Sequence, residues 1–262
     1  MRGLMYGNKI LAQDPRPISL SLMAVIQNAL SYAWRILLIE VANGRFSICN
    51  QDEDVITEQL YMILCELYTS EQEVIEGFSQ FETPVREGNM RNLEGTKLDN
   101  QPDLTFRPLK GIIPTINSAP TAIFVECKPI DSRHPVSGTY CKKGISRFIS
   151  NNYAWAVDRA IMLAYVRNTC PLPEGLAYVL DDSAAKEDYK IQGSLSPLGK
   201  TASGDAVYYT VHGREKSTTP ARIENARISL HHLWLFPDRP CENTSCKVKA
   251  QARQPDIAET FA

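Results

Sequence analysis

The feature that most constrains the fold is a short, continuously apolar segment near the middle of the chain. Thr121 to Cys127 reads Thr-Ala-Ile-Phe-Val-Glu-Cys and is rich in β-branched and aromatic residues. A strand with one face in water alternates apolar and polar residues, and this segment does not alternate. The segment therefore predicts a central strand of a sheet that is covered on both faces.

Helical and extended patterns surround this segment in an order typical of α/β proteins. The periodicity predicts helices over 19–38, 52–68, 140–150 and 175–190, and strands over 74–85, 103–107, 121–127, 160–166, 207–211 and 228–236. Helices first, then strands and helices in alternation, predict an α/β fold with a central mixed β-sheet flanked by helices. We expect one domain: an N-terminal helical segment (1–50) packed on a core (51–236), followed by a loosely ordered C-terminal tail (237–262).

Cysteine usage and hydropathy indicate the compartment. The seven cysteines are an odd number and lie singly in apolar stretches, which favours reduced thiols in a cytoplasmic protein. We expect Cys241 and Cys246 to lie in a surface loop rather than to bind zinc. The apolar stretch 18–42 carries Arg35 and Glu40, which are costly in lipid, so it predicts a buried helix and no membrane association.

The charge balance limits how the chain could meet nucleic acid. The 262 residues include 28 Lys and Arg against 30 Asp and Glu, a formal net charge of −2. This balance excludes a protein that coats nucleic acid through bulk positive charge. It leaves room for a local basic cleft.

The residues that carry chemistry lie on two expected strands. Asp103, which follows Pro102, begins one strand, and Glu126 and Lys128 close another. Because side chains alternate along a strand, Glu126 and Lys128 share a face. If the strands are neighbours, Asp103 and Glu126 form a hard-oxygen site for Mg²⁺ or Mn²⁺, with the backbone carbonyl of Cys127 as a further ligand. The Lys128 ammonium would then hold the attacking water or offset phosphate charge.

This pattern resembles the PD-(D/E)XK nuclease superfamily, which has the restriction-endonuclease-like fold. The matching residues are Pro102, Asp103, Glu126 and Lys128, and the resemblance covers about residues 52–166. It implies a divalent-metal-dependent nuclease that hydrolyses phosphodiester bonds in nucleic acid, most often DNA. An effector role in bacterial anti-phage defence is a further expectation from the resemblance.

The resemblance also implies supporting residues. Members of the superfamily often carry a glutamate on the helix before the sheet, and Glu58 matches that position, with Glu66 as the alternative. The helix after the motif often turns basic groups toward substrate phosphates. The candidates for substrate binding are Lys142, Lys143, Arg147 and the loop residue His134.

Two other interpretations stay open at the level of sequence. The chain could be a nuclease-like subunit with no activity of its own, controlled by or assembled with a helicase or ATPase partner, because no separate DNA-reading module is recognisable. Alternatively, Glu126 and Lys128 are a solvated pair at the end of a strand in an unrelated α/β protein, since Glu-x-Lys alone is a weak motif. The choice between DNA and RNA and the oligomeric state are not determined by the sequence.

Overall fold

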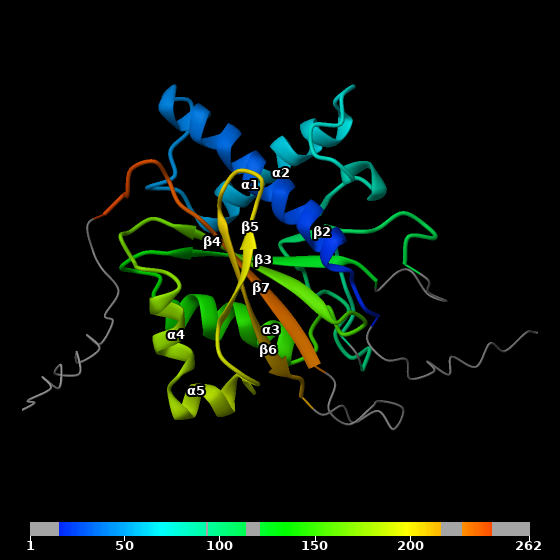
Figure 1. Cartoon of the computed structure of the whole chain (residues 1–262), viewed down its shortest axis with the longest axis vertical. Helices are drawn as coiled ribbons and strands as arrows, with labels where there is room; N and C mark the ends of the chain where they lie inside the picture. The colour runs from blue at the N-terminus through cyan, green and yellow to red at the C-terminus, as the bar shows by residue number, and fades with distance from the viewer. Residues whose placement is uncertain (1–15, 93, 114–120, 216–226, 243–262) are drawn as a thin grey trace, which may run out of the picture.

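A single mixed β-sheet runs through the centre of the molecule (Figure 1). The structure is a computed structural model, and it describes residues 16–92, 94–113, 121–215 and 227–242. The strands are β1 (Val85–Arg86), β2 (Leu104–Phe106), β3 (Ile123–Ile130), β4 (Arg159–Val166), β5 (Ser196–Lys200), β6 (Ala206–Gly213) and β7 (Arg227–Leu235). Their order across the sheet is β1-β2-β3-β4-β7-β6-β5. The three central strands are parallel to one another and the other pairings are antiparallel, so the expected mixed α/β sheet is confirmed.

Helices cover both faces of this sheet (Figure 1). The helical elements are α1 (Leu20–Ala42), α2 (Glu53–Thr69), the 3₁₀ turn η1 (Phe78–Gln80), the π-helix η2 (Val136–Ile145), α3 (Ser146–Ile149), α4 (Glu174–Leu180) and α5 (Ser183–Asp188). Helices α1 and α2 pack together on one face, against β7 and β3. On the other face η2 packs against β3 and β4, and α4 packs against η2. The central strands are therefore shielded on both sides, as their continuous apolar sequence predicts.

Residues of β4 that point to opposite faces of the sheet show how the two layers of helices are joined to it. The Tyr165 ring stacks on Trp34 of α1, and its hydroxyl is hydrogen-bonded to Thr57 of α2. Met162 points to the other face, where it meets Gly144 of η2. A Cβ atom built on Gly144 would lie 2.5 Å from Met162 Cε and 3.5 Å from Lys128 Cγ. A larger residue at this position would require the flexible end of the Met162 side chain to shift, so η2 lies close to β3 and β4 here.

The expected strand over 74–85 is wrong. Of this range only Val85 belongs to a strand, β1, and Phe81 forms an isolated bridge with Pro108 after η1. Gly77 has φ of +84°, a left-handed conformation that turns the chain before a strand can form. The hydrophobic residues Phe78 and Phe81, which suggested a strand, are buried from this turn instead.

Two expected helices differ in detail from the structure, and the structure contains one strand that the sequence does not predict. The helix expected over 140–150 begins earlier, as η2, and continues as α3. The helix expected over 175–190 is divided in two because Asp182 caps the start of α5 through its side chain. Strand β5 was not expected from the sequence, since its Pro, Gly and exposed residues lack a strand pattern.

Helix α1 is long and apolar enough to cross a membrane, judged by length and composition. In the structure, 61% of its most apolar stretch is buried inside the protein. Its residues Met23, Leu30 and Trp34 have no solvent exposure because α2 and the sheet cover them. This burial agrees with the expected buried helix.

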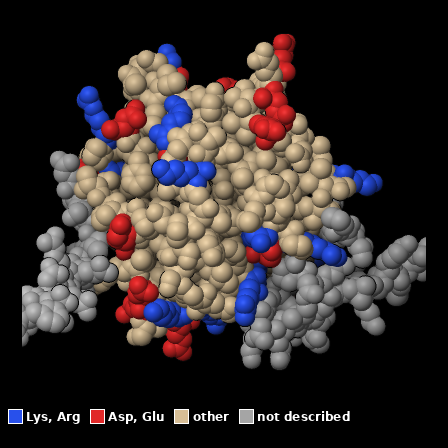
Figure 2. Space-filling model, viewed as in Figure 1, with Lys and Arg blue, Asp and Glu red and all other residues tan. Residues whose placement is uncertain are grey.

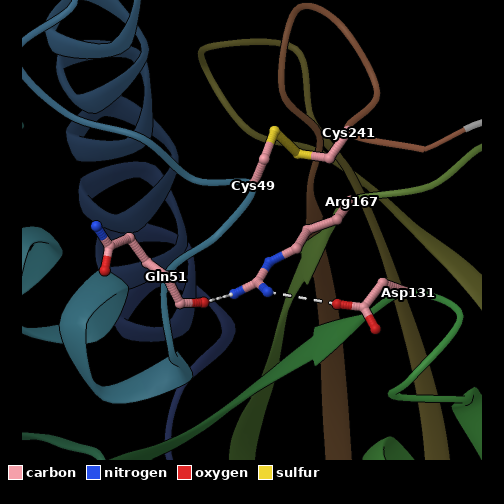
Figure 3. Close-up of a disulfide and its surroundings, with 5 residues drawn as sticks. All are labelled: Cys49, Gln51, Asp131, Arg167 and Cys241. Atoms are coloured by element: carbon pink, nitrogen blue, oxygen red, sulfur yellow. Dashed lines mark hydrogen bonds and ion pairs between the residues drawn. A yellow bond between two sulfur atoms is a disulfide. The ribbon is translucent and has the colours of Figure 1, made fainter.

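The expectation of reduced, unpaired cysteines is wrong for three of them. Cys49 and Cys241 form a disulfide, and Cys170 is also disulfide-bonded. Figure 3 shows that the Cys49–Cys241 bond joins the segment before α2 to the segment after β7. The beginning of the expected loose tail is therefore covalently attached to the core, whereas Cys246 lies outside the described residues.

We predict that loss of this disulfide lowers the free energy of unfolding by about 2–4 kcal/mol, because 192 residues separate the two cysteines and the bond restricts the unfolded chain. The measurement is urea unfolding of Cys49→Ser, with Cys65→Ser, a free and half-buried cysteine, as the matched control. The double variant Cys49→Ser, Cys241→Ser should lose no more stability than either single variant. A full additional loss in the double variant would contradict a shared bond.

A buried chain of hydrogen bonds crosses the sheet on the face of η2. His212 Nδ1 lies 2.7 Å from the carbonyl oxygen of Tyr189, so this nitrogen carries the proton. The Thr210 hydroxyl then donates to His212 Nε2 and accepts from His232 Nε2, at 2.6 and 2.8 Å. His232 Nδ1 in turn lies 2.8 Å from the Tyr140 hydroxyl, which also lies 3.2 Å from the carbonyl oxygen of Met162. Burial lowers the pKa of both His212 and His232 and so favours their neutral forms.

Acid should therefore destabilise the fold through these histidines. Burial lowers the pKa of His212 to about 4, so the unfolded state takes up the proton first as the pH falls below 6.5. Between pH 6.5 and 4, His212 alone accounts for a loss of up to about 3 kcal/mol. We expect urea unfolding to show a smaller loss for His212→Asn than for the wild type over this range. Equal losses in the two proteins would contradict the role of His212.

Candidate functional site

The candidate site lies where β2 and β3 separate. Their ladder joins Leu104 to Val125 and ends there, although the strands are neighbours as the sequence analysis supposed. Beyond this point Asp103 replaces the ladder: its Oδ2 accepts a hydrogen bond of 2.5 Å from the backbone N–H of Cys127. Glu126 and Lys128 lie on β3 beside this point, where Glu126 is fully buried and Lys128 lines a cavity.

The Lys128 ammonium is surrounded by oxygen atoms from three elements. Its Nζ lies 2.5 Å from Glu53 Oε1, 2.6 Å from the carbonyl oxygen of Cys127, 2.8 Å from Glu126 Oε1 and 3.5 Å from Asp103 Oδ2. Only 6% of the Lys128 side chain is exposed. A buried ammonium requires such compensation, so the N-terminal turn of α2, the start of β2 and β3 are held together here.

The Glu126 carboxylate is fully buried and its two oxygens differ. Oε2 accepts hydrogen bonds from the Tyr153 hydroxyl and from Arg147. Oε1 lies 2.8 Å from Lys128 Nζ and 3.0 Å from Arg147 NH1, but neither contact has the angles of a hydrogen bond. Glu126 therefore has one oxygen held by a directional hydrogen bond and one that faces only charge.

Burial and crowding with like charge control protonation in this cluster. Burial, and then the negative charge of Asp103, raises the pKa of Glu126 to about 7. Burial alone would lower the pKa of Lys128, but the attraction of Glu126, Asp103 and Glu53 outweighs it and raises that pKa. Burial also raises the pKa of Glu53, against the attraction of Lys128. With all groups ionised, three carboxylates face Lys128 and Arg147, so the cluster carries one net negative charge and favours an additional cation.

The donor set fits the divalent ion that the sequence analysis expects. Asp103, Glu126 and the carbonyl of Cys127 are hard oxygen donors, and Glu126 Oε1 makes no hydrogen bond. In the described part of the chain no three His, Cys, Asp or Glu side chains already form a group arranged to hold a metal ion. The Lys128 ammonium lies among these oxygens. An incoming ion would compete with the ammonium for the same atoms.

The structure does not bring Glu58 into this cluster. Glu58 Oε2 pairs with Arg86 Nε at 3.2 Å, and about half of its side chain is exposed. Glu66, the alternative, is exposed further along the same helix. The glutamate that reaches Lys128 is Glu53, in the first turn of α2. Sequence reasoning missed Glu53 because acidic residues in a first turn are usually explained by the helix dipole.

Most of the candidate substrate-binding residues line one cavity beside the cluster. A cavity of about 500 Å³ is bordered by Lys128 and Glu53 on one side, and by Lys143, Arg147 and His134. Lys142 is exposed and is not among the lining residues. A second, polar cavity of about 380 Å³ includes Asp103, Arg147 and Tyr153 in its lining, together with Glu87, Asp99, Asn100, Gln101 and Asn152. Arg147 borders both cavities, whereas Glu126 lines neither of them and is fully buried.

The side chain of Cys127 has a different environment from its carbonyl group. The thiol is fully buried on the opposite face of β3, and burial raises its pKa well above the usual value. This thiol is therefore not a ligand from the side of Glu126 and Lys128. The carbonyl oxygen, which the sequence analysis named as a ligand, faces the Lys128 ammonium.

No protein-family model, curated protein or solved structure matches this chain.

We predict that Lys128→Met destabilises the fold by about 3 kcal/mol at pH 8, because it leaves buried carboxylates without their cation. Saturating MnCl₂ should raise the melting temperature of Lys128→Met more than that of the wild type, since the ion no longer competes with the ammonium. Lys142→Met, at an exposed lysine outside the cavity, is the control and should match the wild type in both measurements. A Lys128→Met protein as stable as the wild type and indifferent to Mn²⁺ would contradict this account of the cluster.

Proposed function

We propose that this chain is a divalent-metal-dependent nuclease that hydrolyses phosphodiester bonds in nucleic acid. The observation that carries the proposal is the convergence of Asp103, Glu126, Lys128 and Glu53 at the point where β2 and β3 separate. A solvated pair at a strand end would be exposed, whereas Glu126 is fully buried and Lys128 nearly so. Burial of several charged groups next to cavities is typical of functional sites.

Each residue has a role in this proposal. Asp103, Glu126 and the carbonyl of Cys127 would hold Mg²⁺ or Mn²⁺, and Glu53 takes the place that the sequence analysis gave to Glu58. A bound ion of this kind lowers the pKa of coordinated water and stabilises charge on the leaving oxygen. Lys128 would orient the attacking water, because its ammonium already lies beside both carboxylates.

The arrangement of strands supports the restriction-endonuclease-like fold proposed from the sequence. An antiparallel group, β1-β2-β3, is followed by a crossover through η2 and α3 to the parallel strand β4. Asp103 directly precedes β2, and Glu126 and Lys128 lie on β3, the strand that leads into this crossover. Membership of the PD-(D/E)XK superfamily is part of the proposal.

The surroundings of the cluster suit a substrate that carries phosphates. Lys143, Arg147 and His134 line the larger cavity and would contact phosphate oxygens beside the scissile bond. Figure 2 shows blue and red side chains interspersed on the face in view, without a continuous basic area. The formal net charge of −2 favours a substrate held locally in a cleft over one bound through a broad positive surface. We propose DNA as the substrate, as the superfamily resemblance implies.

One observation favours the alternative of a nuclease-like subunit. The Lys128 ammonium lies directly among the oxygens that a divalent ion would need. A site that stays in this state has no activity of its own, and a helicase or ATPase partner would then be needed to supply or control cleavage. A role in anti-phage defence is compatible with either form.

The cysteines no longer indicate a cytoplasmic location. That inference rested on reduced thiols, and the disulfides at Cys49, Cys170 and Cys241 are typical of oxidising compartments. A cytoplasmic location remains a prediction, and the cysteines do not support it.

The test is cleavage of linear duplex and single-stranded DNA by the purified chain with MgCl₂ or MnCl₂. We expect Asp103→Asn, Glu126→Gln and Glu53→Gln each to reduce metal-dependent cleavage by at least about 100-fold, since each removes a charged group of the cluster. Glu58→Gln lies on the same helix, pairs with Arg86 outside the cluster, and should keep wild-type activity.

The outcomes separate the two candidate functions. Cleavage by the wild type that disappears in the three cluster variants and persists in Glu58→Gln supports an autonomous nuclease. Binding of Mn²⁺ without cleavage supports the subunit that needs a partner. Cleavage that survives in all three cluster variants would refute the proposed site.

A further inference from the structure

Tyr153 is fixed in place more firmly than its position in a loop suggests. It lies between α3 and β4, and only 1% of the residue is exposed. Its ring meets Phe148 edge-on, with centroids 5.3 Å apart, and tilts against Phe124 at 6.1 Å. The nearby residues Asn151 and Ala154 have φ of +57° and +56°. Such a backbone conformation is costly for these residues and persists only where the surroundings impose it.

A buried arginine also holds this loop through hydrogen bonds. The Arg214 guanidinium donates hydrogen bonds to the carbonyl oxygens of Phe148, Ala154 and Val157, at 3.1, 2.8 and 2.6 Å. These acceptors lie on both sides of Tyr153 along the chain. The loop is therefore rigid on either side of the tyrosine, and the direction of its hydroxyl is determined.

That hydroxyl donates a hydrogen bond to Glu126 Oε2. The ring is packed among aromatic residues, where a phenylalanine would fill the same space. A buried hydroxyl is costly without a partner, so the carboxylate is what makes tyrosine suitable here. Since Oε2 is held in this way, the carboxylate of Glu126 turns its other oxygen, Oε1, toward Lys128. Oε1 is the oxygen that makes no hydrogen bond.

We propose that Tyr153 is a positioning residue that presents one oxygen of Glu126 to a divalent cation. By holding Oε2, it prevents the carboxylate from rotating and leaves Oε1 as the ligand atom beside Asp103 and the carbonyl of Cys127. The inference rests on the proposed function, because it assumes that this cluster binds a divalent ion. It adds a residue that the sequence pattern did not indicate, and it assigns different roles to the two oxygens of Glu126.

The test is calorimetric titration of the full chain with MnCl₂ alone, without nucleic acid. We expect Tyr153→Phe to bind Mn²⁺ about 10-fold more weakly than the wild type, the usual effect of removing a hydrogen bond that orients a metal ligand. The concentration of Mn²⁺ that gives half-maximal cleavage should rise by the same factor. Tyr140→Phe is the matched control: it also removes a fully buried hydroxyl, one that bonds His232, and it should leave Mn²⁺ affinity unchanged.

The outcomes distinguish this inference from the proposed function. If the wild type binds no Mn²⁺, the proposed metal site is refuted and the inference with it. If the wild type binds and Tyr153→Phe binds equally well, only the inference is overturned. A similar loss of affinity in Tyr140→Phe would also overturn it, because a general loss of packing would then explain the effect.

A second measurement covers a Tyr153→Phe protein that does not fold. The substitution is then made in the Glu126→Gln background, where the buried charge is absent, and unfolding in urea is compared across the variants. We expect Tyr153→Phe to cost much less stability in this background, because its partner is no longer a carboxylate. Failure to fold in both backgrounds would show that the hydroxyl serves the core and would overturn the inference.

Discussion

The buried ammonium of Lys128 is the interaction on which the rest of the site depends. It contacts oxygen atoms from α2, from Asp103 directly before β2, and from β3. Removing a charge from water is costly, and that cost is recovered only when all the partners are in place. The position of the first turn of α2 is therefore tied to the sheet by electrostatics as well as by packing. The ladder between β2 and β3 ends at this cluster, where the Asp103 side chain, and not another ladder pair, satisfies the N–H of Cys127.

The sequence predicts the central sheet and the motif better than the surroundings. The strand at 121–127, the strand at 103–107 and the helix at 52–68 are all present, because each has a strong local pattern. Asp103 and Glu126 follow from these patterns once their strands are adjacent. Glu53 could not be distinguished from Glu58, because helical periodicity shows which residues share a face but not where the end of the helix points.

Other features depend on contacts between distant parts of the chain. The cysteines at 49 and 241 are paired only because β7 returns beside the segment before α2, which no local pattern reveals. Tyr153 lies in a segment without periodicity, and its role follows from the aromatic residues and the arginine that hold its loop. In each case the deciding interaction is tertiary, so the sequence alone does not contain a visible signal.

The two parts of the site are held by different means. The cluster around Lys128 lies in the middle of β3 and is supported directly by the sheet. The larger cavity instead borders the carboxyl ends of β3 and β4, where ligands commonly bind in such sheets. There Arg167, which follows β4, donates to the carbonyl of Gln51 and pairs with Asp131 (Figure 3). An Asp131 carboxylate oxygen in turn lies 2.7 Å from His134 Nδ1.

The disulfide between Cys49 and Cys241 stabilises the second of these parts, the larger cavity. Cys241 donates its backbone N–H to the carbonyl of Arg167, and Cys49 lies two residues before Gln51. The covalent bond therefore fixes both segments that border Arg167, and through Asp131 it fixes the wall of the cavity that contains His134. The charged cluster needs only the folded sheet, whereas the wall also needs the covalent link. In a nuclease of this design, breaking the disulfide would weaken the hold on the substrate before it disturbed the residues that bind the metal.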